Sequence, residues 1–137
     1  MILSTASRDR GVSRSTLIIG YALTAVAALF LAFDTVGKLL VIQQAVQATT
    51  ELGYPASAVF TIGLIELVCL TLYLVPATSV SGAILLVGYL GGAVATQVRV
   101  GNPLASHVLF PLYVGAVLWG GLYLREPRLR ALLPFRR

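Results

Sequence analysis

Residues 61–75 read TIGLIELVCLTLYLV, and a single carboxylate, Glu66, lies near the middle of this otherwise apolar run. The apolar segment extends over about 56–75, which as a helix is long enough to cross the roughly 30 Å hydrocarbon core of a bilayer. Counted from residue 56, Glu66 lies roughly 15 Å deep, close to the midplane. A charge at that depth is costly, so we expect polar side chains of other helices to surround Glu66.

The composition of the whole chain favours a membrane protein of one domain. Its 137 residues are 58% hydrophobic and only 11% charged, and the mean hydropathy is +0.90. Soluble domains carry about 25% charged residues. A soluble domain of this size also has too little interior to bury so much apolar surface. The lipid bilayer is therefore the expected surrounding of this chain.

Several function classes are excluded or disfavoured by the same composition. The net charge of +5 comes from basic residues in two terminal tails. Nucleic-acid binding is disfavoured, because the sequence lacks a basic stripe interleaved with aromatic residues. The single cysteine, Cys69, cannot form an intrachain disulfide or a dithiol centre. One histidine, one cysteine and scattered acids make a poor ligand set, so we expect no metal site.

Turn signals divide the chain into a polar tail, four apolar segments and a basic tail. The predicted fold is all-α, a bundle of four transmembrane helices between residues 16 and 124. We expect residues 1–15 to form a cytoplasmic N-terminal tail and residues 125–137 a basic cytoplasmic C-terminal tail. In the longest loop, 41–55, the first part could form an interfacial helix, and Gly53-Tyr54-Pro55 is a turn signal. The four spans are expected at about 16–40, 56–75, 80–98 and 106–124.

The distribution of arginine predicts the orientation of the bundle. Cytoplasmic segments of membrane proteins carry an excess of Lys and Arg. The opposite side holds only Lys38 and Arg99, so both termini are expected in the cytoplasm. We expect the C-terminal arginines to lie on anionic lipid headgroups. The arginines of the two tails are Arg8, Arg10, Arg14, Arg125, Arg128, Arg130, Arg136 and Arg137.

This topology brings most of the polar residues outside the tails into the outward half of the bundle. Asp34 and Lys38 are four residues apart and share a helical face. We expect Glu66 to meet Lys38, Arg99 or a tyrosine hydroxyl. A helical face at i, i+3, i+7 and i+10 carries Tyr89, Gly92, Thr96 and Arg99. The candidate intramembrane polar cluster consists of Asp34, Lys38, Glu66, Thr96, Gln97, Arg99 and His107.

Each of these residues also has a purely structural interpretation. Glu66 could be a buried acid that holds helices together, and Asp34 could serve only to neutralise Lys38. Lys38 and Arg99 could extend their charged ends to the headgroups. His107 could be a residue that begins a helix.

Four glycines are predicted to permit close helix packing. Small residues let helix backbones approach each other in lipid, and Gly88 and Gly92 form a GxxxG pair. For this pair we favour packing inside one bundle over a dimer interface. The expected packing glycines are Gly37, Gly63, Gly88 and Gly92.

The order of these motifs resembles the DoxX-like family of small four-helix bacterial membrane proteins. The resemblance rests on FDTVGKL at 33–39, GLIEL at 63–67, GGAVATQVR at 91–99 leading to His107, and LWGGLYLREPRLR at 118–130. It implies a multi-pass protein of the bacterial cytoplasmic (inner) membrane. Some relatives are subunits of a thiosulfate:quinone oxidoreductase, and others associate with redox and oxidative-stress enzymes. The family pattern often has a histidine where this chain has Gln97, which weakens a proton relay there.

Three hypotheses for the function stay open. The first is an accessory, non-catalytic subunit or small-molecule-binding bundle linked to redox chemistry, with quinone as the candidate ligand and a membrane or peripheral redox protein as partner. The second is a proton-coupled transporter or channel, for which four helices are few, so that a homo-oligomer would be needed. The third is a structural membrane protein that only binds a partner. The resemblance carries over no established catalytic residues.

Overall fold

A computed structural model of the protein describes residues 12–133, and every regular element in that range is helical. Residues 1–11, and with them most of the expected N-terminal tail, lie outside the described range, as do residues 134–137. The arginines Arg8, Arg10, Arg136 and Arg137 fall in these two segments. The α-helices are α1 (Arg14–Leu39), α2 (Gln43–Glu51), α3 (Ala58–Leu74), α4 (Ser79–Val100), α5 (Phe110–Arg125) and α6 (Pro127–Leu132). A short 3-10 helix, η1 (Pro76–Thr78), precedes α4, and a short π-helix, η2 (Leu104–Val108), precedes α5.

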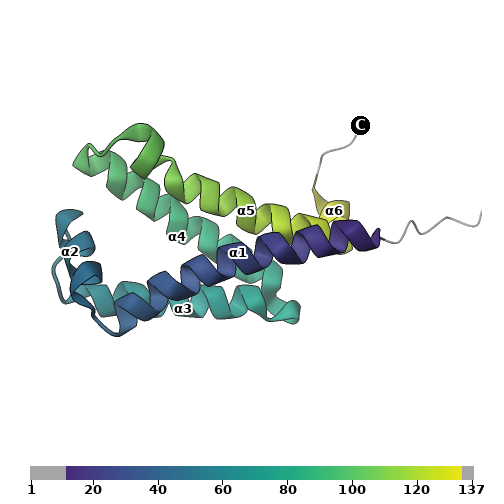
Figure 1. Cartoon of the computed structure of the whole chain (residues 1–137), viewed down its shortest axis with the longest axis horizontal. Helices are drawn as coiled ribbons and strands as arrows, with labels where there is room; N and C mark the ends of the chain where they lie inside the picture. The colour runs from purple at the N-terminus through teal and green to yellow at the C-terminus, as the bar shows by residue number, and fades with distance from the viewer. Residues whose placement is uncertain (1–11, 134–137) are drawn as a thin grey trace, which may run out of the picture.

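The four long helices pack in a closed ring. Helix α1 contacts α3 and α5, and helix α4 contacts the same two helices. Figure 1 shows the start of α1 and the short α6 at one end of the molecule, with α2 at the other end. Toward the α2 end the pair α1–α3 diverges from the pair α4–α5 (Figure 1). The ring is therefore closely packed near the chain termini and wider at the opposite end.

The helix ends follow from local sequence. The hydroxyl of Ser13 accepts a hydrogen bond of 3.2 Å from the backbone N–H of Thr16 and caps α1. Helix α4 ends at Val100 and is followed by Gly101, whose φ of 75° lies in the left-handed region that glycine adopts without strain. Val41, with φ 53°, turns the chain from α1 into α2. A β-branched residue seldom adopts that conformation. Backbone hydrogen bonds of 3.1 Å from Val41 to the carbonyl of Lys38 and from Ile42 to the carbonyl of Gly37 close this turn.

Three helical stretches are long and apolar enough to cross a membrane, namely Arg14–Leu39, Pro76–Val100 and Leu104–Arg125. The fourth apolar helix, α3, has 17 residues and is shorter. These bounds lie close to the segments predicted at 16–40, 56–75, 80–98 and 106–124, although α3 begins two residues later and ends one residue earlier than expected. The 41–55 segment does contain a helix, α2, which forms most of it.

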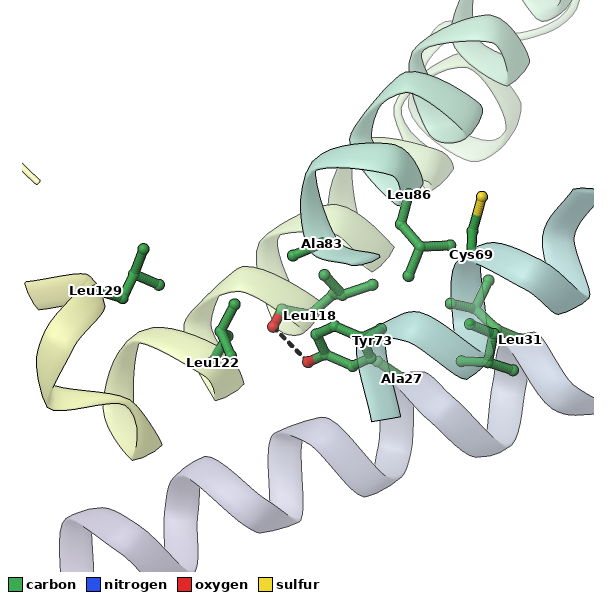
Figure 2. Packing of buried hydrophobic residues seen from close by; sticks show 10 residues of the cluster. Ala27, Leu31, Cys69, Tyr73, Ala83, Leu86, Leu118, Leu122 and Leu129 are labelled. Carbon is green, nitrogen blue, oxygen red and sulfur yellow. Dashed lines mark hydrogen bonds between the residues drawn. The ribbon is translucent and has the colours of Figure 1, made fainter. Parts of the chain in front are cut away.

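The hydrophobic core fills the half of the ring that lies near the start of α1 and near α6. Tyr73, Leu86, Leu118 and Leu122 are fully buried and come from α3, α4 and α5. Figure 2 shows these side chains converging between the helices, with the Tyr73 hydroxyl donating a 2.7 Å hydrogen bond to the carbonyl of Leu118. That bond satisfies the one polar atom of the tyrosine, so the ring can be buried among leucines.

Two arginines of the C-terminal segment bind the protein itself. Arg125 donates from Nε to the hydroxyl of Thr24 at 3.1 Å. Arg130 donates to the carbonyl oxygens of Tyr123 at 2.7 Å and Leu124 at 2.6 Å. Carbonyls in the last turn of a helix lack partners within the helix, and a guanidinium satisfies them. Arg125 and Arg130 therefore stabilise the end of α5 and its contact with α1 through these hydrogen bonds.

Candidate functional site

Lys38 is the centre of a cluster of polar side chains from three helices. Its ammonium group forms an ion pair with Asp34, one turn earlier on α1. It also lies 3.0 Å from Oε2 of Glu66 on α3 and 2.7 Å from the hydroxyl of Tyr89 on α4. The Tyr89 hydroxyl in turn donates to Oε2 of Glu66 at 3.0 Å. The predicted meeting of Glu66 with Lys38 and a tyrosine hydroxyl is thus present in the structure.

A glycine explains why α1 and α3 come close enough for this contact. A Cβ atom on Gly63 would lie only 2.7 Å from the Cβ of Lys38. Glu66 follows Gly63 by three residues and therefore shares its helical face. The missing side chain at Gly63 lets the two helices approach, and the carboxylate of Glu66 then reaches the ammonium of Lys38. The predicted packing role of Gly63 agrees with this geometry.

The charges of the cluster differ in their exposure. Glu66 is 0% exposed, whereas the side chains of Lys38 and Asp34 are 14% and 42% exposed. Burial of an ion is costly unless charged and hydrogen-bonded partners replace water, and Lys38 and Tyr89 supply them for Oε2. The second oxygen, Oε1, is buried without a hydrogen-bond partner in the described part of the chain. Glu66 is therefore only half satisfied by the protein.

A cavity of about 490 Å³ adjoins the cluster. Its volume lies within the range of small-molecule sites in proteins, roughly 300–1,000 Å³. It lies between the diverging pairs of helices, with Asp34, Lys38, Glu66 and Tyr89 among its lining residues. The rest of the wall is largely apolar and includes Phe30, Leu31, Ile62, Ile65, Leu90, Phe110, Pro111 and Val114.

Further polar groups line the cavity toward the α2 end. Thr96 donates to the carbonyl of Gly92 at 2.8 Å, and its hydroxyl lies 3.0 Å from that of Tyr54. Gln97 also lines the cavity and accepts a hydrogen bond from the amide of Asn102. Eight residues separate Tyr89 from Gln97, so this second polar group lies roughly 12 Å farther along α4. Thr96 and Gln97 belong to the cavity but do not contact Glu66.

Arg99 and His107 are not part of the cluster. Arg99 is exposed and donates from Nη2 to the carbonyl of Leu52 at 2.7 Å, which ties the end of α4 to the chain after α2. His107 is exposed in η2, with Nδ1 2.7 Å from the hydroxyl of Ser106. Arg99 lies ten residues beyond Tyr89, about 15 Å along the helix, which is too far for a contact with Glu66. Their expected participation is therefore wrong.

The GxxxG pair has a different place from the one predicted. No heavy atom of the described residues lies within 4 Å of a Cβ built on Gly88 or Gly92 beyond their own neighbourhood, so neither glycine is at a close helix crossing within this chain. Both glycines line the cavity. Gly37 packs against Ile42, 3.2 Å from the position of its added Cβ, at the turn into α2. Gly88 and Gly92 therefore leave open space beside the cavity instead of forming a close helix contact within the described part of the chain.

Tyr89 is the residue of the cluster that the candidate set lacked. Its position on one helical face with Gly92 and Thr96 was visible in the sequence, but six tyrosines were available to meet Glu66. Only the packing of α4 against α3 selects Tyr89.

The model of the DoxX-like family matches residues 22–121, which include the whole cluster and the helices around the cavity. No curated protein and no solved structure matches the chain. The matched segment covers most of the chain, and it contains long apolar helices able to cross a membrane. The chain is a multi-pass membrane protein that belongs to the DoxX-like family.

Proposed function

We propose that this protein is a non-catalytic, ligand-binding membrane subunit linked to redox chemistry, and that its cavity holds a quinone-type ring. The observation that carries the proposal is the polar cluster of Lys38, Glu66 and Tyr89 on the wall of a largely apolar cavity. A ring with polar substituents and an apolar tail matches such a wall, because the apolar residues bury the ring while a few polar groups orient it. The partner would be a membrane or peripheral redox protein.

The membrane arrangement that goes with this function has four spans. The 17 residues of α3 rise about 25 Å, and a helix slightly shorter than the bilayer core is accommodated by local thinning. With four spans and basic residues concentrated near both termini, the termini lie in the bacterial cytoplasm. The cavity then opens in the half of the inner membrane that faces away from the cytoplasm.

Transport is less well supported by this geometry. Between Glu66 and the end of the ring that carries α6, the interior is filled by buried side chains. They include Leu70, Tyr73, Leu86 and Leu118. A path through a single chain would have to displace this core. A channel would therefore need a different arrangement of the helices or an interface between several copies, whereas ligand binding needs only the cavity as it stands.

Substitution of the cavity glycines tests the proposal. Gly88→Leu and Gly92→Leu place a side chain in the cavity, and no atom within 4 Å of the new Cβ opposes it. We expect both variants to fold and to bind a decyl-1,4-benzoquinone at least about tenfold more weakly, because a tenfold loss needs only 1.4 kcal/mol of lost contacts. Titration of the purified protein in nanodiscs measures the affinity.

Gly91→Leu is the matched control. Gly91 is on the same helix, is exposed and also has nothing within 4 Å of an added Cβ, but it does not line the cavity. Its affinity should equal that of the wild type. Failure of the wild type to bind the quinone, or equal losses in all three variants, would reject the cavity as the binding site.

A further inference from the structure

The hydroxyl of Thr49 is a buried polar group without a hydrogen-bond partner among the described residues. Thr49 lies on α2, is only 5% exposed and lines the cavity. A threonine within a helix often donates to a carbonyl one turn earlier, as the adjacent Thr50 does to Val46 at 2.9 Å, but Thr49 does not. Unlike Oε1 of Glu66, its hydroxyl is not enclosed on all sides, so a group in the cavity can reach it.

The amide of Gln97 is a second unused donor on the cavity wall. Its oxygen accepts a hydrogen bond from Asn102, whereas its NH2 group has no partner in the described part of the chain. Gln97 lines the cavity near the end of α4. A primary amide nitrogen can only donate, so this group calls for an acceptor.

Tyr54 holds the two donors at the same end of the cavity. Its N–H donates to the carbonyl of Thr49 at 3.3 Å, and its hydroxyl lies 3.0 Å from that of Thr96, the residue before Gln97. Thr96 gives its own proton to the carbonyl of Gly92, so the Tyr54 hydroxyl donates to Thr96. The protons of both bridging hydroxyls are therefore used inside the protein, and those of Thr49 and Gln97 remain.

The charged cluster around Lys38 offers a ligand no further donor. A lysine ammonium has three donors, and here they are directed to Asp34, Glu66 and Tyr89. The one hydroxyl proton of Tyr89 goes to Oε2 of Glu66. A ligand carbonyl, which can only accept a hydrogen bond, finds no free donor among these residues.

We infer that Thr49 and Gln97 together bind the polar end of the ligand, and that this end is an uncharged hydrogen-bond acceptor such as a ring carbonyl. This inference rests on the proposed function and names the residues that select the ligand. An anion would also accept, but Asp34 and Glu66 place two carboxyl groups against one ammonium on the same cavity wall and would repel it. A carbonyl satisfies both donors without adding charge.

Removal of the Thr49 hydroxyl tests the inference. Thr49→Val keeps the branched shape of the side chain, and the loss of one neutral hydrogen bond should weaken the binding of decyl-1,4-benzoquinone in nanodiscs about fivefold. Thr49→Ser keeps the hydroxyl and should bind the quinone more tightly than Thr49→Val. Thr50→Val is the matched control, because Thr50 is exposed and does not line the cavity, and its affinity should equal that of the wild type.

Gln97→Glu tests the second donor. One oxygen of the new carboxylate can still accept from Asn102, while the other takes the place of the NH2 group and opposes the carbonyl of the ligand. We expect the affinity for the quinone to fall at least about tenfold. Gln43→Glu adds the same charge to an exposed position on α2 that does not line the cavity, and it should keep the wild-type affinity.

Decylbenzene separates the hydrogen bonds from the shape of the cavity. It keeps the ring and the tail of the quinone but has no carbonyl. It should bind the wild type more weakly than the quinone does, and it should bind Thr49→Val as tightly as the wild type. An equal loss of decylbenzene and quinone in Thr49→Val would mean that the substitution deforms the cavity, and the inference would be wrong.

The possible results distinguish this inference from the proposed function. If the quinone binds the wild type, Thr49→Val and Gln97→Glu equally, the inference is overturned and the ligand-binding function stands. If the wild type binds neither compound, the proposed function fails and the inference fails with it. Equal affinities of the wild type for quinone and decylbenzene would also overturn the inference, even if a variant does not fold.

Discussion

Lys38 is the residue on which the polar cluster depends. Its ammonium joins α1 to α3 through Glu66 and to α4 through Tyr89. Because Glu66 is completely buried, removal of its cation would leave a carboxylate without compensation in an apolar surrounding. The loss of one partner of such a pair costs more than the pair contributes as a whole.

This reasoning predicts strong coupling between Lys38 and Glu66. We expect Lys38→Met to lower the free energy of unfolding by about 3 kcal/mol, since it strands a buried charge. The double variant Lys38→Met/Glu66→Gln should recover at least about 1 kcal/mol of that loss. Reversible unfolding in mixed micelles, read by circular dichroism, measures each step of the cycle. Additive losses would show that the two side chains do not interact.

At the scale of the helices, glycines decide where two backbones meet. A Cβ on Gly82 of α4 would lie 2.5 Å from the Cα of Tyr73 on α3, whereas a Cβ on Gly88 meets nothing within 4 Å. The same helix therefore crosses α3 closely near the termini and leaves space for the cavity six residues later. The divergence of the helix pairs seen in Figure 1 agrees with this change along α4.

Alanine substitutions at these two glycines should have opposite effects. Gly82→Ala drives a methyl group into backbone, which cannot move aside as a side chain can, and should lower the free energy of unfolding by about 2 kcal/mol. Gly88→Ala meets no clash and should be neutral or stabilise the helix by about 0.5 kcal/mol. Thermal unfolding of both variants in the same detergent compares them. A similar stability of the two variants would mean that the crossing at Gly82 is looser than described.

At the scale of the whole molecule, the membrane orientation can be tested with single cysteines. Cys69 is buried and can be replaced by alanine to give a cysteine-free background. Ser15, at the start of α1, and Ala105, in the η2 connection from α4 to α5, are both exposed. Figure 1 shows the start of α1 and the α4–α5 connection at opposite ends of the molecule. A membrane-impermeant maleimide should label Ala105→Cys in intact cells and Ser15→Cys only after permeabilisation. The reverse pattern would invert the orientation, and labelling of both from one side would show that α3 does not cross the membrane.

Hydropathy and helix periodicity, which are local properties, were enough to predict much of this protein. They predicted the all-helical fold, the approximate bounds of the long helices and the pairing of Asp34 with Lys38. These features need only the apolar length of a segment or the spacing of residues within one helix. The family resemblance also followed from motifs in the chain, and the match over residues 22–121 agrees with it.

The tertiary structure alone decided which residues meet Glu66 and where a ligand could lie. Sequence gives the depth of a residue along its helix, but not the rotation of that helix about its axis or its angle to a neighbour. That is why Arg99 and His107 were expected beside Glu66, although Arg99 binds the Leu52 carbonyl and His107 is exposed. Close crossings at Gly63 and Gly82, with open space at Gly88, set the rotation and the divergence of the helices, and from these follow the contact with Tyr89 and the cavity beside it.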